Sequence, residues 1–173
     1  FYMSFAGELA AAFKARGIHV LAETCGHFRL DAFMEKLYPS LDAIYFDLKL
    51  HDPDRHKHYC GVDNRVIFEN FRFLQDRAGA DGLVLLPRIP LVPGITDTAD
   101  NLGGLAEFLV HQGASRVQLL PYNPLWPEKE NKLGRPTQFG KKFRQAGFMP
   151  QAEGERCEAT FRHRNILTLR EAP

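Results

Sequence analysis

The sequence has few cysteines, no excess of either charge and no long apolar run. Its 173 residues carry 22 Lys and Arg against 21 Asp and Glu, for a formal net charge of +1. Such a balance predicts no nucleic-acid or membrane-surface partner. No apolar run approaches the ~20 residues that a membrane-spanning helix needs. Residues 1–7 also lack the basic start and apolar core of a signal peptide. We therefore expect a globular, cytoplasmic protein.

The three cysteines, Cys25, Cys60 and Cys157, are widely spaced along the chain. An odd and sparse set argues against a disulfide framework and fits a reducing cytosol. The spacing also excludes a clustered C-x-x-C metal site within this sequence. One further stretch gathers several residue types that bind metals: Asp52, His56, His58 and Cys60. Its H-x-H-x-C spacing matches no closed tetrahedral zinc site, so we interpret the stretch as a solvated loop.

Strand-like and helix-like segments alternate along the chain. Apolar, β-branched and aromatic runs predict strands over 18–23, 43–49, 83–89, 116–120 and 165–169. Helical spacing and capping residues predict helices over 8–16, 30–37, 65–77, 98–111 and 151–162. This alternation indicates βαβ units and a parallel α/β sheet within a single domain, residues 1–173.

Four or five such units are too few to close an eight-stranded barrel of ~250 residues. The chain is therefore either an open doubly wound sheet or an arc of an incomplete barrel. An arc leaves the strand near Ile18 as an unpaired edge, which indicates that a part of the fold is missing before it.

Polar side chains lie at or just after the carboxyl end of each of the first four predicted strands. They are Glu23, Thr24, Asp47, Lys49, Arg88 and Asn123. The carboxyl ends of parallel strands meet at one edge, where α/β proteins bind their ligands. We therefore expect carboxylate, ammonium, guanidinium and amide groups to gather there.

Asp47 and Lys49 are two residues apart, so they share one face of their strand. Such a pair can hold a zwitterion, with Lys49 toward a carboxylate and Asp47 toward an ammonium or a sugar hydroxyl. The alternative is a structural ion pair inside the fold.

Five short motifs carry a family resemblance by their order and spacing. They are G-I-H-V with E-T-C-G (17–26), Y-F-D-L-K (45–49), G-V-D-N (61–64), R-I-P-L-V-P-G (88–94) and L-L-P-Y-N (119–123). Over residues 8–134 the chain resembles the glycyl-radical enzyme activating enzymes, whose type is pyruvate formate-lyase activating enzyme, in the radical S-adenosylmethionine (SAM) superfamily. The tail, 135–173, adds little to the match.

The resemblance implies a partial (β/α)6 TIM-like barrel, of which this chain would supply about four to five βα units. It implies an oxidoreductase with SAM and a [4Fe-4S] cluster as cofactors, and flavodoxin or ferredoxin as electron donor. Reductive cleavage of SAM to a 5′-deoxyadenosyl radical would abstract hydrogen from a glycine of a partner enzyme, a pyruvate formate-lyase-like glycyl-radical enzyme. Residue by residue, the family's SAM-binding positions fall on Asp47, Lys49, Arg88 and Asn123. Its monovalent-cation positions fall on Glu23, Thr24 and Asp47.

The sequence departs from the family pattern at several positions. Glu23 replaces an Asp, and Asn123 replaces a His and cannot act as an acid or base. The C-x-x-x-C-x-x-C cluster motif and the Gly-Gly-Glu-Pro segment are absent from this sequence. We therefore expect no cluster and no catalytic residue within this chain, which would be an inactive C-terminal part of an activase.

Two other functions remain open. One is a natural cluster-free pseudoenzyme that keeps the fold as a binding module. The other is an unrelated barrel enzyme with Lys49 as a Schiff-base lysine. The neighbouring Asp47 argues against the second, because a nearby negative charge raises a lysine pKa.

Overall fold

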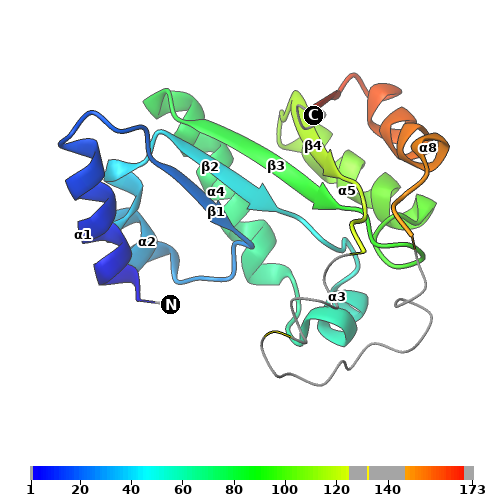
Figure 1. Ribbon diagram of the computed structural model, residues 1–173, viewed down its shortest axis with the longest axis horizontal. Helices are drawn as coiled ribbons and strands as arrows, with labels where there is room; N and C mark the ends of the chain where they lie inside the picture. Colours follow the sequence, from blue (N-terminus) through cyan, green and yellow to red (C-terminus); the bar gives the residue numbers. More distant parts are fainter. Residues whose placement is uncertain (1, 125–131, 133–146, 170–173) are drawn as a thin grey trace.

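The computed structural model describes residues 2–124, 132 and 147–169 (Figure 1). The strands of this part are β1 (Leu21–Thr24), β2 (Ala43–Asp47), β3 (Val84–Pro90), β4 (Arg116–Leu120) and β5 (Leu167–Leu169). The α-helices are α1 (Met3–Lys14), α2 (Leu30–Lys36), α3 (Pro53–Cys60), α4 (Arg65–Asp81), α5 (Ala99–His111) and α8 (Gln151–Arg162), with a 3-10 turn η1 (Tyr38–Ser40). Among these described helices, none combines the length and the apolar character needed to cross a membrane.

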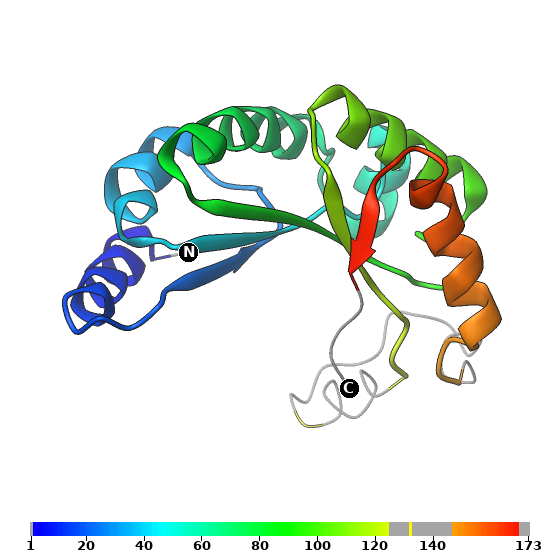
Figure 2. The same cartoon turned by 90° about the horizontal axis from the view of Figure 1, so that it is seen from above.

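The five strands form one parallel sheet in the order β1-β2-β3-β4-β5. A doubly wound sheet reverses its strand order at a switch point, whereas a barrel adds each strand beside the previous one. Figure 2 shows the sheet curving, with the helices along its convex side. The fold is therefore an unclosed arc of a (β/α) barrel, as predicted, and the doubly wound alternative is excluded.

The hydrophobic core lies between the convex face of the sheet and the helices. Phe46 and Leu48 are fully buried there, and the Phe46 ring meets Phe71 of α4 edge-on with centroids 5.2 Å apart. The alternate residues Tyr45 and Asp47 are only partly buried, because they lie on the concave face. The concave face is therefore where polar side chains remain accessible.

Helix α3 corrects the interpretation of residues 52–60 as a loop. Asp52 caps the helix, since its carboxylate accepts a hydrogen bond of 2.7 Å from the Arg55 N–H. Pro53 occupies the first turn, and Gly61 ends the helix with a left-handed φ of 83°. The Asp-Pro start and the Gly stop are local helix signals. The polar composition of the segment hid them.

Most other elements lie close to their predicted ranges. The fourth strand matches its prediction, 116–120, and helix α8 matches its prediction, 151–162. Helix α1 starts earlier than predicted, at Met3, and β1 is shorter than predicted, at Leu21–Thr24. Within the described residues β1 is an edge of the sheet, and an apolar groove of about 440 Å³ runs between it and α1.

Candidate functional site

The carboxyl ends of β1, β2 and β3 are joined by the guanidinium of Arg88. Its Nη1 lies 2.8 Å from Oε1 of Glu23, and its Nε and Nη2 each lie 3.1 Å from Oδ1 of Asp47. The Arg88 side chain is 10% exposed, against 24% for Asp47 and 58% for Glu23. Three of the predicted site residues therefore form one charge-assisted hydrogen-bond network on the concave face.

The sheet register explains this meeting. Asp47 is the direct partner of Arg88, whereas Glu23 is the partner of Tyr45, one layer lower on the same face. The long Arg88 side chain spans the difference, and its Cζ lies 5.1 Å from the centroid of the Tyr45 ring. The aromatic face beneath the guanidinium adds a cation–π contact to the two ion pairs.

Electrostatics keep Arg88 charged. Burial alone lowers the pKa of Arg88, but the hydrogen bonds and negative charges of Glu23 and Asp47 outweigh it, so the pKa of Arg88 is raised above its ordinary value. The network is therefore one fixed cation between two carboxylates.

Lys49 lies just beyond β2 and continues that strand's alternation of buried and partly exposed side chains. Its neighbours Leu48 and Leu50 are buried, and Lys49 itself is partly exposed. Within the part of the chain that the structure describes, its ammonium makes no hydrogen bond or ion pair, and the Asp47 carboxylate pairs with Arg88. The positive charge of Lys49 also acts on the Cys60 thiol. Partial burial raises the pKa of Cys60, and the Lys49 charge lowers it in part.

Thr24 differs from the other predicted residues in its orientation. It is the register partner of Phe46, which faces the helices, and register partners in a parallel pair share a face. Its hydroxyl accepts a hydrogen bond of 3.1 Å from the Gly26 N–H. Glu23 and Asp47 therefore both form ion pairs with Arg88, whereas the Thr24 hydroxyl closes a turn.

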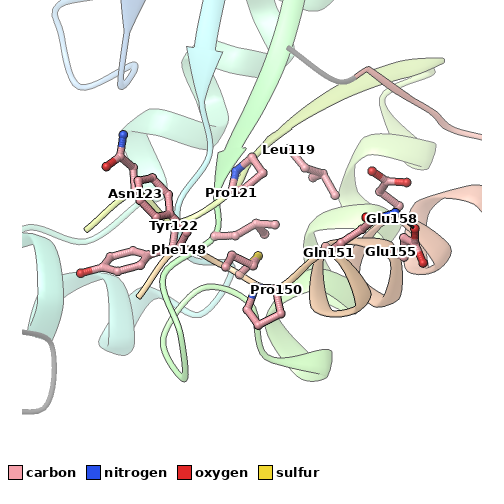
Figure 3. Close-up of a pocket in the computed structure, with 12 residues that line it drawn as sticks. Leu119, Pro121, Tyr122, Asn123, Phe148, Pro150, Gln151, Glu155 and Glu158 are labelled. Atoms are coloured by element: carbon pink, nitrogen blue, oxygen red, sulfur yellow. Dashed lines mark hydrogen bonds between the residues drawn. The ribbon is translucent and has the colours of Figure 1, made fainter. Parts of the chain in front are cut away.

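Asn123 follows β4 at the same rim and is exposed. It borders a cavity of about 390 Å³ between the β4 end and α8 (Figure 3). Figure 3 shows Asn123 and Tyr122 at one end of this cavity and Glu155 and Glu158 of α8 at the other. Since Leu119, a cavity wall, packs in the core on the helix side, the cavity is separate from the concave Arg88 network. Trp126, which the sequence places in the following loop, lies outside the described residues.

Metal-binding groups do not gather in the described part of the chain. No three His, Cys, Asp or Glu side chains there are placed to hold a metal ion. Cys25 and Cys60 are exposed, Cys157 is buried in α8, and all three are free thiols. His56 is buried, with Nδ1 2.7 Å from the carbonyl oxygen of Val62. These residues do not fit a [4Fe-4S] cluster.

Sequence reasoning missed three buried asparagines, Asn64, Asn70 and Asn101. Asn64 is the residue directly before α4, but its side chain makes no hydrogen bond to that helix. Each side-chain amide instead binds backbone groups of a loop that follows a strand. A single sequence gives no signal for such contacts, because the partners are distant along the chain.

The sequence is similar to several characterised activating enzymes, although no family model matches it. It is 36% identical over 128 residues to the isethionate sulfite-lyase activating enzyme of Nitratidesulfovibrio vulgaris (strain Hildenborough), covering 74% of this chain and 40% of that protein. It is 35% identical over 106 residues to the indoleacetate decarboxylase activating enzyme of Tractidigestivibacter scatoligenes, covering 61% of this chain and 33% of that protein. Over the part that it spans, the chain belongs to the glycyl-radical enzyme activating enzymes.

Solved structures agree with this family on the fold. A domain of pyruvate-formate lyase-activating enzyme from Bacteroides vulgatus superposes with a TM-score of 0.72 at 21% identity, covering 99% of this chain and 92% of that one. A radical SAM methyltransferase from Sphaerobacter thermophilus gives 0.60 at 17% identity, covering 90% of this chain and 42% of that one. The chain spans two fifths or less of the two activating enzymes compared above.

Proposed function

We propose that this chain is the SAM-binding arc of a cytoplasmic glycyl-radical enzyme activase. The observation that carries the proposal is the convergence of Glu23, Asp47 and Arg88 beside Lys49, at the carboxyl rim of a parallel barrel arc. Ligand sites of parallel α/β folds lie at this rim. The family membership gives the ligand class, a zwitterionic amino acid joined to a nucleoside.

The rim offers complementary groups for such a ligand. Lys49, without an internal partner in the described residues, can bind the ligand carboxylate. Both Arg88 contacts to Asp47 go to Oδ1. A carboxylate has about four acceptor sites, so Asp47 can also accept from the ligand ammonium or a ribose hydroxyl. In this proposal Asn123, an exposed residue after β4 with an amide donor and acceptor, contacts the adenosyl group.

When reduced, SAM supplies a 5′-deoxyadenosyl radical that can take hydrogen from a glycine of a partner enzyme. In this proposal the residues of the rim bind and orient the ligand. The partner would be a glycyl-radical enzyme and the electron donor flavodoxin or ferredoxin. The relatives' names include a sulfite-lyase and decarboxylases.

A monovalent cation held by the Glu23 and Asp47 carboxylates is part of the proposal; the hydroxyl of the third predicted ligand, Thr24, lies on the opposite face of the sheet. Such an ion would share both carboxylates with the guanidinium of Arg88. We therefore expect SAM affinity to respond to replacing K⁺ by tetramethylammonium at constant ionic strength.

The cluster-free binding module differs from the activase in one measurable property. An activase cleaves SAM to 5′-deoxyadenosine and methionine under anaerobic reduction after reconstitution with iron and sulfide, whereas a binding module leaves SAM intact. This assay should be carried out on the protein purified from its native source, because this chain spans only part of the relatives' length. Cleavage that depends on Asp47 would support the activase.

The direct test of the proposal is titration calorimetry of SAM into the chain. We expect binding that Lys49→Ala weakens about tenfold, equivalent to about 1.4 kcal/mol. Lys57→Ala is the matched control, because Lys57 is an exposed lysine of α3 and is not one of the predicted site residues. No binding by the unaltered chain, or equal losses in both variants, would refute the proposal.

A further inference from the structure

The Lys49 ammonium makes no hydrogen bond or ion pair within the described residues, but the backbone that carries it is held by side chains from α5 and from the residue before α4. Asn101 of α5 donates from Nδ2 to the carbonyl oxygens of Lys49, at 3.1 Å, and Thr96, at 2.8 Å. Its Oδ1 accepts a hydrogen bond of 2.7 Å from the His51 N–H. One side chain thus binds the backbone on both sides of Leu50.

Asn64, directly before α4, completes the arrangement. Its Nδ2 donates to the carbonyl oxygens of Leu50, at 2.8 Å, and His51, at 2.7 Å. Four backbone polar groups of the segment 49–51, its three carbonyl oxygens and the His51 N–H, are therefore bound by two asparagine side chains, each only 4% exposed. Buried amides that donate hydrogen bonds to the backbone favour one local conformation, because losing a partner leaves a desolvated polar group.

The packing of α5 strengthens this hold. A Cβ atom placed on Gly104 would lie 2.6 Å from the His51 ring, so the glycine lets the helix approach the segment closely. The His51 ring also meets Phe68 of α4 edge-on, with centroids 6.0 Å apart. The segment after β2 is thus fixed by backbone hydrogen bonds and by ring packing.

We infer that Asn101 is a positioning residue that sets the direction in which Lys49 leaves the rim. This inference rests on the proposed function, in which the Lys49 ammonium binds the SAM carboxylate. A lysine side chain has about 2 kcal/mol of rotamer entropy to lose on ordering. A fixed backbone origin limits the volume that the ammonium explores, so less of that entropy remains to be lost when the ligand binds.

The test compares Asn101→Ala with Asn70→Ala. Asn70 is also 4% exposed, and its Nδ2 donates to two carbonyl oxygens, those of Gly26 at 2.8 Å and Phe28 at 2.9 Å. It holds the loop after β1, not the one that carries Lys49. Both variants should lower the urea midpoint, whereas only Asn101→Ala should raise the dissociation constant of SAM, by about fivefold (a loss of about 1 kcal/mol).

A double-mutant cycle separates positioning from general loosening. In the Lys49→Ala background, Asn101→Ala should weaken SAM binding no further, because its effect passes through Lys49. Losses that add in the double variant would overturn the inference, as would an equal loss in Asn70→Ala.

If the unaltered chain does not bind SAM, the proposed function is refuted. The positioning role of Asn101 can then still be tested by a measurement that needs no ligand. Trace acetylation of the folded chain, followed by mass spectrometry, gives the reactivity of Lys49 relative to Lys57. Asn101→Ala should change this ratio about twofold or more, and Asn70→Ala should leave it unchanged. An unchanged ratio in Asn101→Ala would overturn the positioning role. If Asn101→Ala does not fold, Asn101→Asp, which keeps Oδ1 and loses the donors, replaces it with the same expectation.

Discussion

The guanidinium of Arg88 lies 2.8 Å from the carboxylate of Glu23, although strand β2 separates their strands β3 and β1. Neighbouring strands lie about 4.8 Å apart, so β1 and β3, which have β2 between them, would be about 10 Å apart in a flat sheet. The curvature of the arc turns the inward side chains toward one another, and the length of the arginine closes the rest. The contact between Glu23 and Arg88 therefore depends on the curvature of the sheet.

Replacing Arg88 should cost more stability than replacing its more exposed partner. Arg88→Met leaves Asp47 and Glu23 without their shared cation, and we expect a loss of about 1–2 kcal/mol in the free energy of unfolding. Glu23→Gln removes an exposed charge while Asp47 still pairs with Arg88, so we expect less than 1 kcal/mol. Urea unfolding monitored by circular dichroism measures both. Equal losses would mean that the network does not stabilise the arc through Arg88.

Gly26 should tolerate no side chain. Its φ is +77°, and an added Cβ would lie 2.1 Å from the Phe46 ring in the core. Gly26→Ala should therefore destabilise the fold by about 2–4 kcal/mol through backbone strain and forced repacking. Gly17→Ala is the matched control, because Gly17 has a φ of +72° but open space at its Cβ position. Its loss should be about 1 kcal/mol. Urea unfolding measures both variants, and midpoints that shift by the same amount would contradict the steric explanation.

Stability should fall in strongly alkaline solution through Tyr38. Burial and the hydrogen bond of its hydroxyl to Asp81, at 3.1 Å, raise the pKa of Tyr38 to about 12. The folded pKa lies above the ordinary value of about 10, so the neutral form is favoured in the folded state. Its contribution is complete below pH 10 and is lost as the pH rises toward 12. Urea midpoints measured from pH 9 to 11.5 should decline more steeply for the unaltered chain than for Tyr38→Phe. Parallel declines would contradict this role.

The cap of α3 should be worth a measurable part of the stability. Asp52→Ala removes the acceptor of the Arg55 N–H, and we expect a loss of about 1 kcal/mol. Asp54→Ala changes a neighbouring exposed carboxylate in the first turn, which gives only the weaker interaction with the helix dipole, about 0.5 kcal/mol. Thermal unfolding of the two variants side by side checks the order. A larger loss for Asp54→Ala would refute the assignment of the cap.

Much of the arc could be read from the sequence because its signals are local. The apolar runs of β2 and β4 and the helical spacing of α4 and α5 arise from neighbours along the chain, and the structure keeps these elements near their predicted ranges. The two-residue spacing of Asp47 and Lys49 likewise places both on the concave side of β2. Helix α3 also had local signals, at Asp52 and Gly61, but its polar composition outweighed them in the prediction.

The sequence by itself determined the strand and helix alternation, the strand ends that carry charged side chains, and the family to which they point. Tertiary structure alone decided that Asp47 pairs with Arg88 instead of Lys49, and that Glu23 reaches the same guanidinium across β2. It also decided that Asn101 holds the backbone of Lys49 from a helix far along the chain. Periodicity fixes only the face on which a side chain lies. Which partner it meets there depends on sheet curvature, strand register and helix packing, and these arise between residues that are distant in sequence.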